Sequence, residues 1–175
     1  DYETGQVLYS KNGYSKLYPA STTKAWTAYI VLKNVKDLNK VVEIKDLPVV
    51  DGSSMYLKEG ESFTVKELWD ALLIHSSNDV AMVLAKYVGG SVENFVNMMN
   101  KKVKELGCTN THFTNPHGLH DENHYTTASD LSKIAVYAMK LPFFAEAVKL
   151  TKHTIPPTNK MDKERIITST NQLIC

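Results

Sequence analysis

The middle of the chain carries apolar residues at helical spacing. Thr64 and Glu67 have the spacing of a capping box, and the apolar residues after them share one face, so a helix is predicted to begin at Thr64. A second helix is predicted from about residue 78 to Val88, where Gly89-Gly90 stops it. A third should begin at Ser91 and end at Gly107, and its apolar face consists of Val92, Phe95, Val96, Met99, Val103 and Leu106.

Helical patterning resumes after a loop-like stretch at residues 108–126. It runs from Thr127 to Lys140, and Pro142 opens a further short helix. The helical region is therefore predicted to span about residues 64–150. Nearer the start of the chain, Ser21, Thr22 and Thr23 can cap a helix whose apolar positions include Trp26, Ile30 and Val31.

Extended segments are predicted near both ends. Residues 1–10 read as a strand with a turn at Thr4-Gly5, and residues 41–50 as a short β-like segment. Residues 152–175 are mixed, and Pro156-Pro157 breaks them. The coarse expectation is an α+β fold with β-type segments near the ends and a helical middle.

Composition narrows the class of protein. The 175 residues fit one domain, and 43% hydrophobic with 22% charged residues is typical of an ordered globular chain. The net charge of +1 comes from interspersed residues, which gives no tract for nucleic acid, and no apolar run is long enough to span a membrane. The chain begins at Asp1 without a signal peptide, so we expect a processed product. Cys108 and Cys175 allow one disulfide, but their spacing does not favour it.

Ser21-Thr-Thr-Lys24 is the first pattern that suggests chemistry. At a helix start, positions i and i+3 share a face, so the Ser21 hydroxyl and the Lys24 amine would lie side by side. A serine needs an adjacent base to act as a nucleophile, and a lysine can serve when burial favours its neutral form. On this tetrapeptide alone, a capping serine with a solvated lysine is the better explanation of the pattern.

Ser76-Ser-Asn78 is the second pattern, and it lies where one predicted helix ends and the next begins. A hydroxyl and an amide two residues apart on a turn could pass a proton and hold a peptide group. Ser and Asn also gather at helix starts for capping, so this pattern alone is weaker than the first.

Residues 112–124 suggest a competing function. They hold His112, His117, His120 and His124, with acidic residues between them, and such clusters can bind zinc. The spacing does not fit a helix-borne zinc site, however, and the region reads as loop. A metal-binding function therefore ranks below the serine chemistry.

Longer strings join these patterns. The segment Tyr18–Lys24 resembles the nucleophile segment of the low-molecular-mass penicillin-binding proteins, the D-alanyl-D-alanine carboxypeptidases. Residues 1–9, 54–61, 76–81, 106–119 and 124–131 are similar to other strings of that family, in the same order. The resemblance covers nearly the whole chain. It implies a β-lactamase/transpeptidase-like α+β fold, with a helical middle and part of an antiparallel sheet.

The resemblance also implies an activity. Ser21 would attack the penultimate carbonyl of a peptidoglycan stem peptide that ends in D-Ala-D-Ala, and Lys24 would take the serine proton. Ser76 would help to protonate the leaving D-alanine, and Asn78 would bind the substrate's peptide group. Penicillins would acylate Ser21. No cofactor is implied, His117 and His124 become structural loop residues, and the protein would be exported to the outer face of the bacterial cytoplasmic membrane or beyond.

The chain departs from the family pattern at two places. Neither Lys-Thr-Gly nor Lys-Ser-Gly, the family's third motif, occurs in the 175 residues, and His75 stands where the family often has a small residue or proline. We therefore expect residues 1–175 to form a partial catalytic domain, incomplete at its C-terminal end, that is nearly inactive and self-associates. A non-catalytic fold fragment or binding module, and a serine β-lactamase, remain as alternatives.

Overall fold

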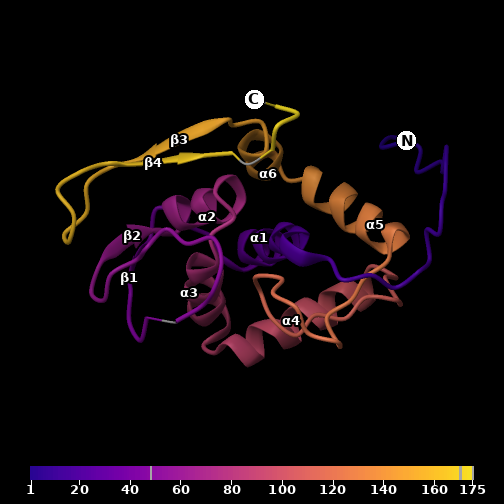
Figure 1. The fold of residues 1–175 in the computed structure, drawn as a ribbon, viewed down its shortest axis with the longest axis horizontal. Coiled ribbons are helices and arrows are strands. Elements are labelled where there is room, and N and C mark those ends of the chain that lie inside the picture. The colour runs from indigo at the N-terminus through magenta and orange to yellow at the C-terminus, as the bar shows by residue number, and fades with distance from the viewer. Residues whose placement is uncertain (48, 170, 175) are drawn as a thin grey trace.

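The computed structural model describes residues 1–47, 49–169 and 171–174, so Cys175 and the disulfide suggested for it lie outside the described residues. A helix at the centre, α1 (Thr23–Asn34), follows a single 3₁₀ turn, η1 (Ala20–Thr22). It packs against α2 (Val65–Ile74), α3 (Asn78–Gly89), α4 (Val92–Glu105) and α5 (Ala128–Met139), which surround it in Figure 1. Most of α1 is buried for this reason.

The helix boundaries follow the signals in the sequence. The Thr64 hydroxyl accepts a hydrogen bond from the Glu67 amide while the Glu67 carboxylate accepts from the Thr64 amide, which confirms the predicted capping box. Gly90 and Gly107 both have positive φ directly after or near a helix end, where glycine adopts the left-handed conformation without steric cost. Pro142 begins α6 (Pro142–Ala147), as predicted.

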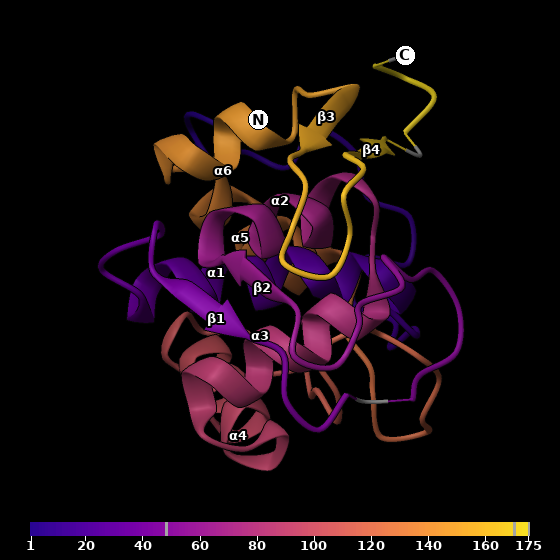
Figure 2. The ribbon, with the colours of Figure 1, turned by 90° about the vertical axis from the view of Figure 1, so that its left-hand side faces the viewer.

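In the part of the chain that the structure describes, the strands form two separate antiparallel pairs. In the first pair, β1 (Val41–Glu43) runs beside β2 (Ser62–Thr64). In the second, β3 (Lys152–Ile155) runs beside β4 (Arg165–Thr168) and passes over α2 (Figure 1). Figure 2 shows the connection between β3 and β4 descending next to β2, and there the Asn159 side chain accepts from the Ser62 amide at 2.9 Å.

A buried carboxylate fixes the position of this hairpin. Glu61 is fully buried and pairs with Arg165 of β4 at 2.8 Å, and it also accepts from the Thr158 hydroxyl and from the Lys58 amide. Burial raises the pKa of Glu61, but the hydrogen bonds from Arg165, Thr158 and Lys58 outweigh it and lower the pKa below its usual value. Because a buried charge needs such partners, Glu61 holds the hairpin against the rest of the fold.

Two of the predicted extended segments differ from the structure. Residues 1–10 form a turn around Gly5 and then continue without strand pairing, with Val7, Leu8 and Tyr9 at least 73% exposed, so the predicted strand is wrong for this chain. Of the described residues in the range 41–50, which leaves out residue 48, only β1 is a strand. A strand exists only where a partner supplies a hydrogen-bond ladder, and within the described residues nothing pairs with residues 1–10.

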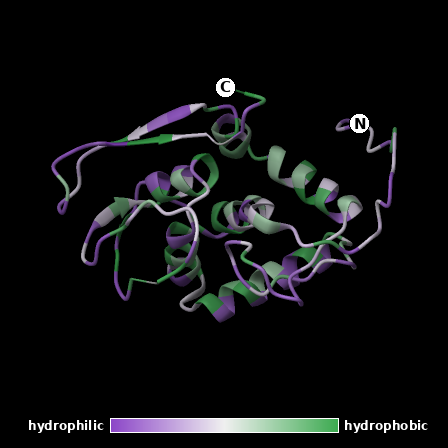
Figure 3. Cartoon of the chain, in the orientation of Figure 1, coloured by the Kyte–Doolittle hydropathy of each residue, from purple (hydrophilic) through white to green (hydrophobic). Residues whose placement is uncertain are grey.

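The core lies between α1 and the helices around it. Its largest fully buried side chains include Trp26 and Trp69, whose ring nitrogens donate to the backbone carbonyls of Met99 and Ala28. Figure 3 shows hydrophobic and hydrophilic residues alternating along α4, whose buried residues face the core and whose lysines face outward. Within the described residues, no helix combines the length and apolarity needed to cross a membrane.

Candidate active site

The chain enters α1 through a tight turn. Ala20 has a φ of 48°, an unusual value for a residue with a side chain, and the Thr22 amide donates to the Pro19 carbonyl at 3.2 Å. The prediction that hydroxyls cap this helix is wrong: the Thr22 hydroxyl donates to the Pro19 carbonyl, and Thr23 contacts His124. The Thr22 amide is thus satisfied by the backbone, and within the described residues no hydrogen bond joins the Ser21 hydroxyl to an amide of the turn.

Ser21 and Lys24 lie together, as their spacing predicts. The Lys24 Nζ atom is 3.0 Å from the Ser21 Oγ atom. Ser21 is exposed, whereas Lys24 is only 2% exposed. A hydroxyl open to solvent therefore sits on a buried amine, beside the positive end of α1.

Burial changes the ionisation of Lys24. It lowers the pKa of the lysine from 10.5 to about 8, because the buried ammonium loses its hydration. The ion pairs found within the described residues do not include Lys24, so no carboxylate there offsets this effect. Instead Nζ donates to the backbone carbonyl of His117 at 2.7 Å. A useful fraction of the amine is thus neutral near pH 7 and able to accept a proton from Ser21.

A loop after α4, residues 113–124, lies against the first turns of α1, and we name it the bracing loop. Thr27 of α1 donates to the Pro116 carbonyl at 2.6 Å. Gly118 has a φ of 91°, and a Cβ atom there would lie 1.9 Å from the Ala20 carbonyl oxygen, so only glycine fits. These contacts were not predicted from the sequence, where the one signal for them is the glycine directly after His117.

Ser76 lies on the connection between α2 and α3, and Asn78 is the first residue of α3, where the sequence predicted that one helix ends and the next begins. Ser76 has a φ of 58°, a strained value for a residue with a side chain, and such strain gathers at functional sites. The Asn78 side-chain amide donates to the Asp51 carbonyl at 2.6 Å, and its backbone amide donates to the Ser53 carbonyl at 2.7 Å. Within the described residues no hydrogen bond joins Ser76 or Asn78 to the Ser21–Lys24 pair, although α3 packs directly on α1.

Three buried polar atoms at this connection have no hydrogen-bond partner within the described residues. They are Nδ1 of His75, Oγ of Ser77 and Oδ1 of Asn78. Buried polar groups are nearly always paired, so unpaired ones gathered within four residues are unusual. His75 is the residue that directly follows α2.

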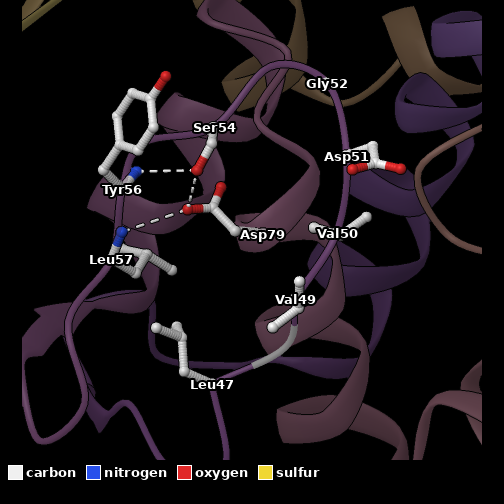
Figure 4. A pocket seen from close by; sticks show the side chains of 9 residues that line it. All are labelled: Leu47, Val49, Val50, Asp51, Gly52, Ser54, Tyr56, Leu57 and Asp79. Carbon is white, nitrogen blue, oxygen red and sulfur yellow. Dashed lines mark hydrogen bonds between the residues drawn. The ribbon is translucent and has the colours of Figure 1, made fainter.

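The segment before β2 wraps the N-terminus of α3. The Asp79 carboxylate accepts from the Ser54 hydroxyl at 2.7 Å and from the backbone amides of Met55 and Leu57. Figure 4 shows the contacts of Asp79 with Ser54 and Leu57 in the lining of a hollow of about 410 Å³. The hollow is mainly apolar, and the backbone carbonyl of Asp51, which lines it, accepts the hydrogen bond from the Asn78 side chain.

The four histidines have separate surroundings. His112 donates from Nδ1 to the Asn123 carbonyl, and His120 packs edge-on against Tyr18. His117 accepts the Leu119 amide at Nδ1, and His124 is hydrogen-bonded through both ring nitrogens. Within the described ranges, no three His, Cys, Asp or Glu side chains lie close enough together to hold a metal ion.

Comparison with known proteins gives a consistent result. A family model described as D-alanyl-D-alanine carboxypeptidase matches residues 1–175. The chain is 38% identical to the D-alanyl-D-alanine carboxypeptidase DacF of Bacillus subtilis, over 98% of this chain and 45% of that protein. It is 36% identical to DacC of Escherichia coli, over 96% of this chain and 42% of that protein. The chain thus spans less than half of each of these relatives.

Solved structures share the fold. The crystal structure of the D-alanyl-D-alanine carboxypeptidase from Mycobacterium tuberculosis H37Rv matches with a TM-score of 0.91 and 33% identity, over 99% of this chain and 65% of that one. The Streptomyces K15 DD-transpeptidase matches with a TM-score of 0.91 and 31% identity, over 99% and 72%. The expected transpeptidase-like α+β fold is confirmed. The chain belongs to the D-alanyl-D-alanine carboxypeptidase family.

Proposed function

We propose that this chain carries the nucleophile of a serine D-alanyl-D-alanine carboxypeptidase. The observation that supports this most strongly is the buried Lys24 amine, 3.0 Å from the exposed hydroxyl of Ser21. The substrate is a peptidoglycan stem peptide ending in D-Ala-D-Ala. Such a substrate lies outside the cytoplasmic membrane, so we also propose that the protein is exported.

In this mechanism the Ser21 oxygen bonds to the penultimate carbonyl carbon, and its proton passes to Lys24. The Ser21 backbone amide donates to the developing oxyanion. The peptide C–N bond then breaks, and Ser76 relays a proton to the nitrogen of the departing D-alanine. Asn78 holds the substrate's peptide group. Water hydrolyses the acyl-enzyme, whereas penicillins acylate Ser21 and leave slowly. None of these steps uses a metal or an organic cofactor.

The proposal predicts a stereospecific product. The longest natural protein that contains this chain should release D-alanine from a diacyl-lysyl-D-Ala-D-Ala peptide, because Ser21 is poised to attack its penultimate carbonyl. The measurement is D-alanine release, detected with D-amino-acid oxidase. The matched control is the same peptide ending in D-Ala-L-Ala, which should release no alanine on a chromatographic assay. Equal release from both peptides, or from neither, would contradict the proposal.

We propose that residues 1–175 are one partial catalytic domain that is nearly inactive by itself. In the family, the Lys-Thr-Gly strand binds the terminal carboxylate and completes the oxyanion hole, and the sequence 1–175 lacks that motif. Loss of one oxyanion donor costs about 10²–10³ in rate. A polypeptide of these 175 residues should therefore be acylated by penicillin at least about a hundredfold more slowly than the longest natural protein that contains them.

The same polypeptide should self-associate. Its exposed apolar residues Val7, Leu8 and Tyr9, and the open edges of two-stranded sheets, favour pairing with a second copy. Light scattering should give more than a monomer mass, and Leu8→Lys should shift it toward the monomer. A monomeric 175-residue chain that is acylated at the rate of the longest natural protein would contradict both expectations.

A further inference from the structure

We infer that His124 is a positioning residue for the proposed nucleophile pair. Its hydrogen bond to the Thr23 hydroxyl holds the bracing loop on α1, so that the His117 carbonyl aims the Lys24 amine at Ser21. This inference rests on the proposed function. It assigns a task to a histidine that does not itself touch Ser21 or Lys24 through any hydrogen bond within the described residues.

The hydrogen bonds of His124 determine which nitrogen carries the proton. The Thr114 amide donates to Nδ1 at 3.0 Å, so Nδ1 presents a lone pair. The neutral ring then carries its proton on Nε2, which lies 2.8 Å from the Thr23 Oγ atom and donates to it. His124 is 1% exposed, and this burial is the main reason that its pKa is lowered to about 4. The ring is therefore neutral and locked in one orientation at neutral pH.

The ring joins the loop to α1 at the residue next to Lys24. Its Nδ1 side is fixed to the loop backbone at Thr114, and its Nε2 side is fixed to Thr23. The Phe113 ring packs against it with the centroids 5.5 Å apart, which leaves it little freedom to turn. Residues 115–123 lie between Thr114 and His124, and they include His117, whose carbonyl accepts the hydrogen bond from the Lys24 amine.

The position of the His117 carbonyl controls the direction of the Lys24 lone pair. A neutral amine has two N–H bonds and one lone pair. When one N–H points to the His117 carbonyl at 2.7 Å, the lone pair can face the Ser21 hydroxyl at 3.0 Å. If the loop moves away, the amine can rotate and present an N–H to Ser21 instead. The serine then has no acceptor for its proton, although the penicillin-binding surface is unchanged.

Two substitutions at position 124 separate this role from simple packing. In His124→Gln, the amide nitrogen can occupy the place of Nε2 and donate to Thr23, but the bond from Thr114 is lost. In His124→Asn, the amide oxygen can occupy the place of Nδ1 and accept from Thr114, but it does not reach Thr23. Thr23→Val and Thr23→Ser form the matching pair at the other end, since only serine retains the hydroxyl.

The test uses the longest natural protein that contains this chain. Stopped-flow acylation by a fluorescent penicillin measures two quantities separately: the dissociation constant of the penicillin before acylation and the acylation rate constant. His124→Asn and Thr23→Val should lower the rate constant by about 10- to 100-fold, a typical cost of misplacement by an ångström, and should change the dissociation constant less than about twofold. His124→Gln and Thr23→Ser should stay within about threefold of the wild type. The double variant of His124→Asn with Thr23→Val should be no slower than the slower single variant, because both remove one contact.

A crystal structure of His124→Asn supplies a readout that does not depend on activity. The distance from Lys24 Nζ to the His117 oxygen should exceed about 3.5 Å in that variant and stay within hydrogen-bond range in His124→Gln. Additive losses, full activity of Thr23→Val, or an unchanged distance would overturn the inference. If His124→Asn does not fold, Thr23→Val and His124→Gln still decide it. A wild-type protein that penicillin does not acylate would overturn the proposed function instead. The distance from Lys24 Nζ to the His117 oxygen would then still test whether His124 holds the bracing loop on α1.

Discussion

Replacing Ser21 with alanine should abolish covalent labelling by a fluorescent penicillin. Within the described residues, Ser21 has the one hydroxyl that is hydrogen-bonded to a lysine side-chain Nζ atom, because the other hydrogen bonds from lysine Nζ atoms run to carbonyl or carboxylate oxygens. Without the Ser21 oxygen no acyl bond can form at this site. The acylation rate should fall on the order of 10⁴-fold or more.

The experiment uses the longest natural protein, labelled to completion and separated on a denaturing gel. Thr22→Ala is the matched control, because it removes the neighbouring hydroxyl, which donates to the Pro19 carbonyl and not to Lys24. That variant should still be labelled. Mass spectrometry of the wild type should place the adduct on the peptide that contains Ser21. Persistent labelling of Ser21→Ala at the wild-type rate would show that another residue is the nucleophile.

Much of the site could be predicted from residues that are close together in the sequence. Ser21 and Lys24 come together because they are three residues apart where a helix begins, and the structure shows this contact at 3.0 Å. The helix that starts at Thr64 could be predicted from its capping box, and Ser76 and Asn78 lie on the connection where the helix signals change. In each of these cases the residues that determine the geometry are close in sequence.

The environment of Lys24 could not be predicted in this way. The carbonyl that receives its amine belongs to His117, 93 residues away, and a backbone carbonyl leaves no mark in the residue types. The bond from His124 to Thr23 spans 101 residues. The family resemblance implied that both histidines are structural loop residues, and it did not indicate where they lie relative to α1. Such contacts depend on the path of a loop, which tertiary packing decides.

The predicted strand at residues 1–10 shows a different limit. Val7-Leu8-Tyr9 has the β-branched and aromatic character that favours strands, yet these residues remain exposed and unpaired within the described residues. Strand propensity measures how well a residue fits a sheet, and it does not supply the neighbouring strand. The α1 helix needs no such partner for its hydrogen bonds, so its prediction succeeded where the strand prediction was wrong.

Lys24→Arg should remove acylation although the positive charge remains. A guanidinium stays protonated in proteins and cannot accept the Ser21 proton, whereas the Lys24 amine, with its pKa lowered to about 8 by burial, can. At that pKa about one amine in ten is neutral at pH 7, against about one in three thousand at the ordinary value of 10.5. Because general base catalysis contributes about 10²–10⁴ in rate, the variant should lose about that much.

The pH dependence provides the sharper test. Because the neutral amine is the reactive form, the acylation rate of the wild type should rise about tenfold from pH 7 to pH 9, as the proton leaves Lys24. Lys24→Arg should show no such rise, and Lys33→Arg, on the same helix but exposed, should behave as the wild type does. A Lys24→Arg protein that is acylated at nearly the normal rate would show that the site needs only a positive charge beside Ser21. The base would then have to be another group, and the short contact between Lys24 and Ser21 would serve to stabilise the oxygen after its proton had gone elsewhere.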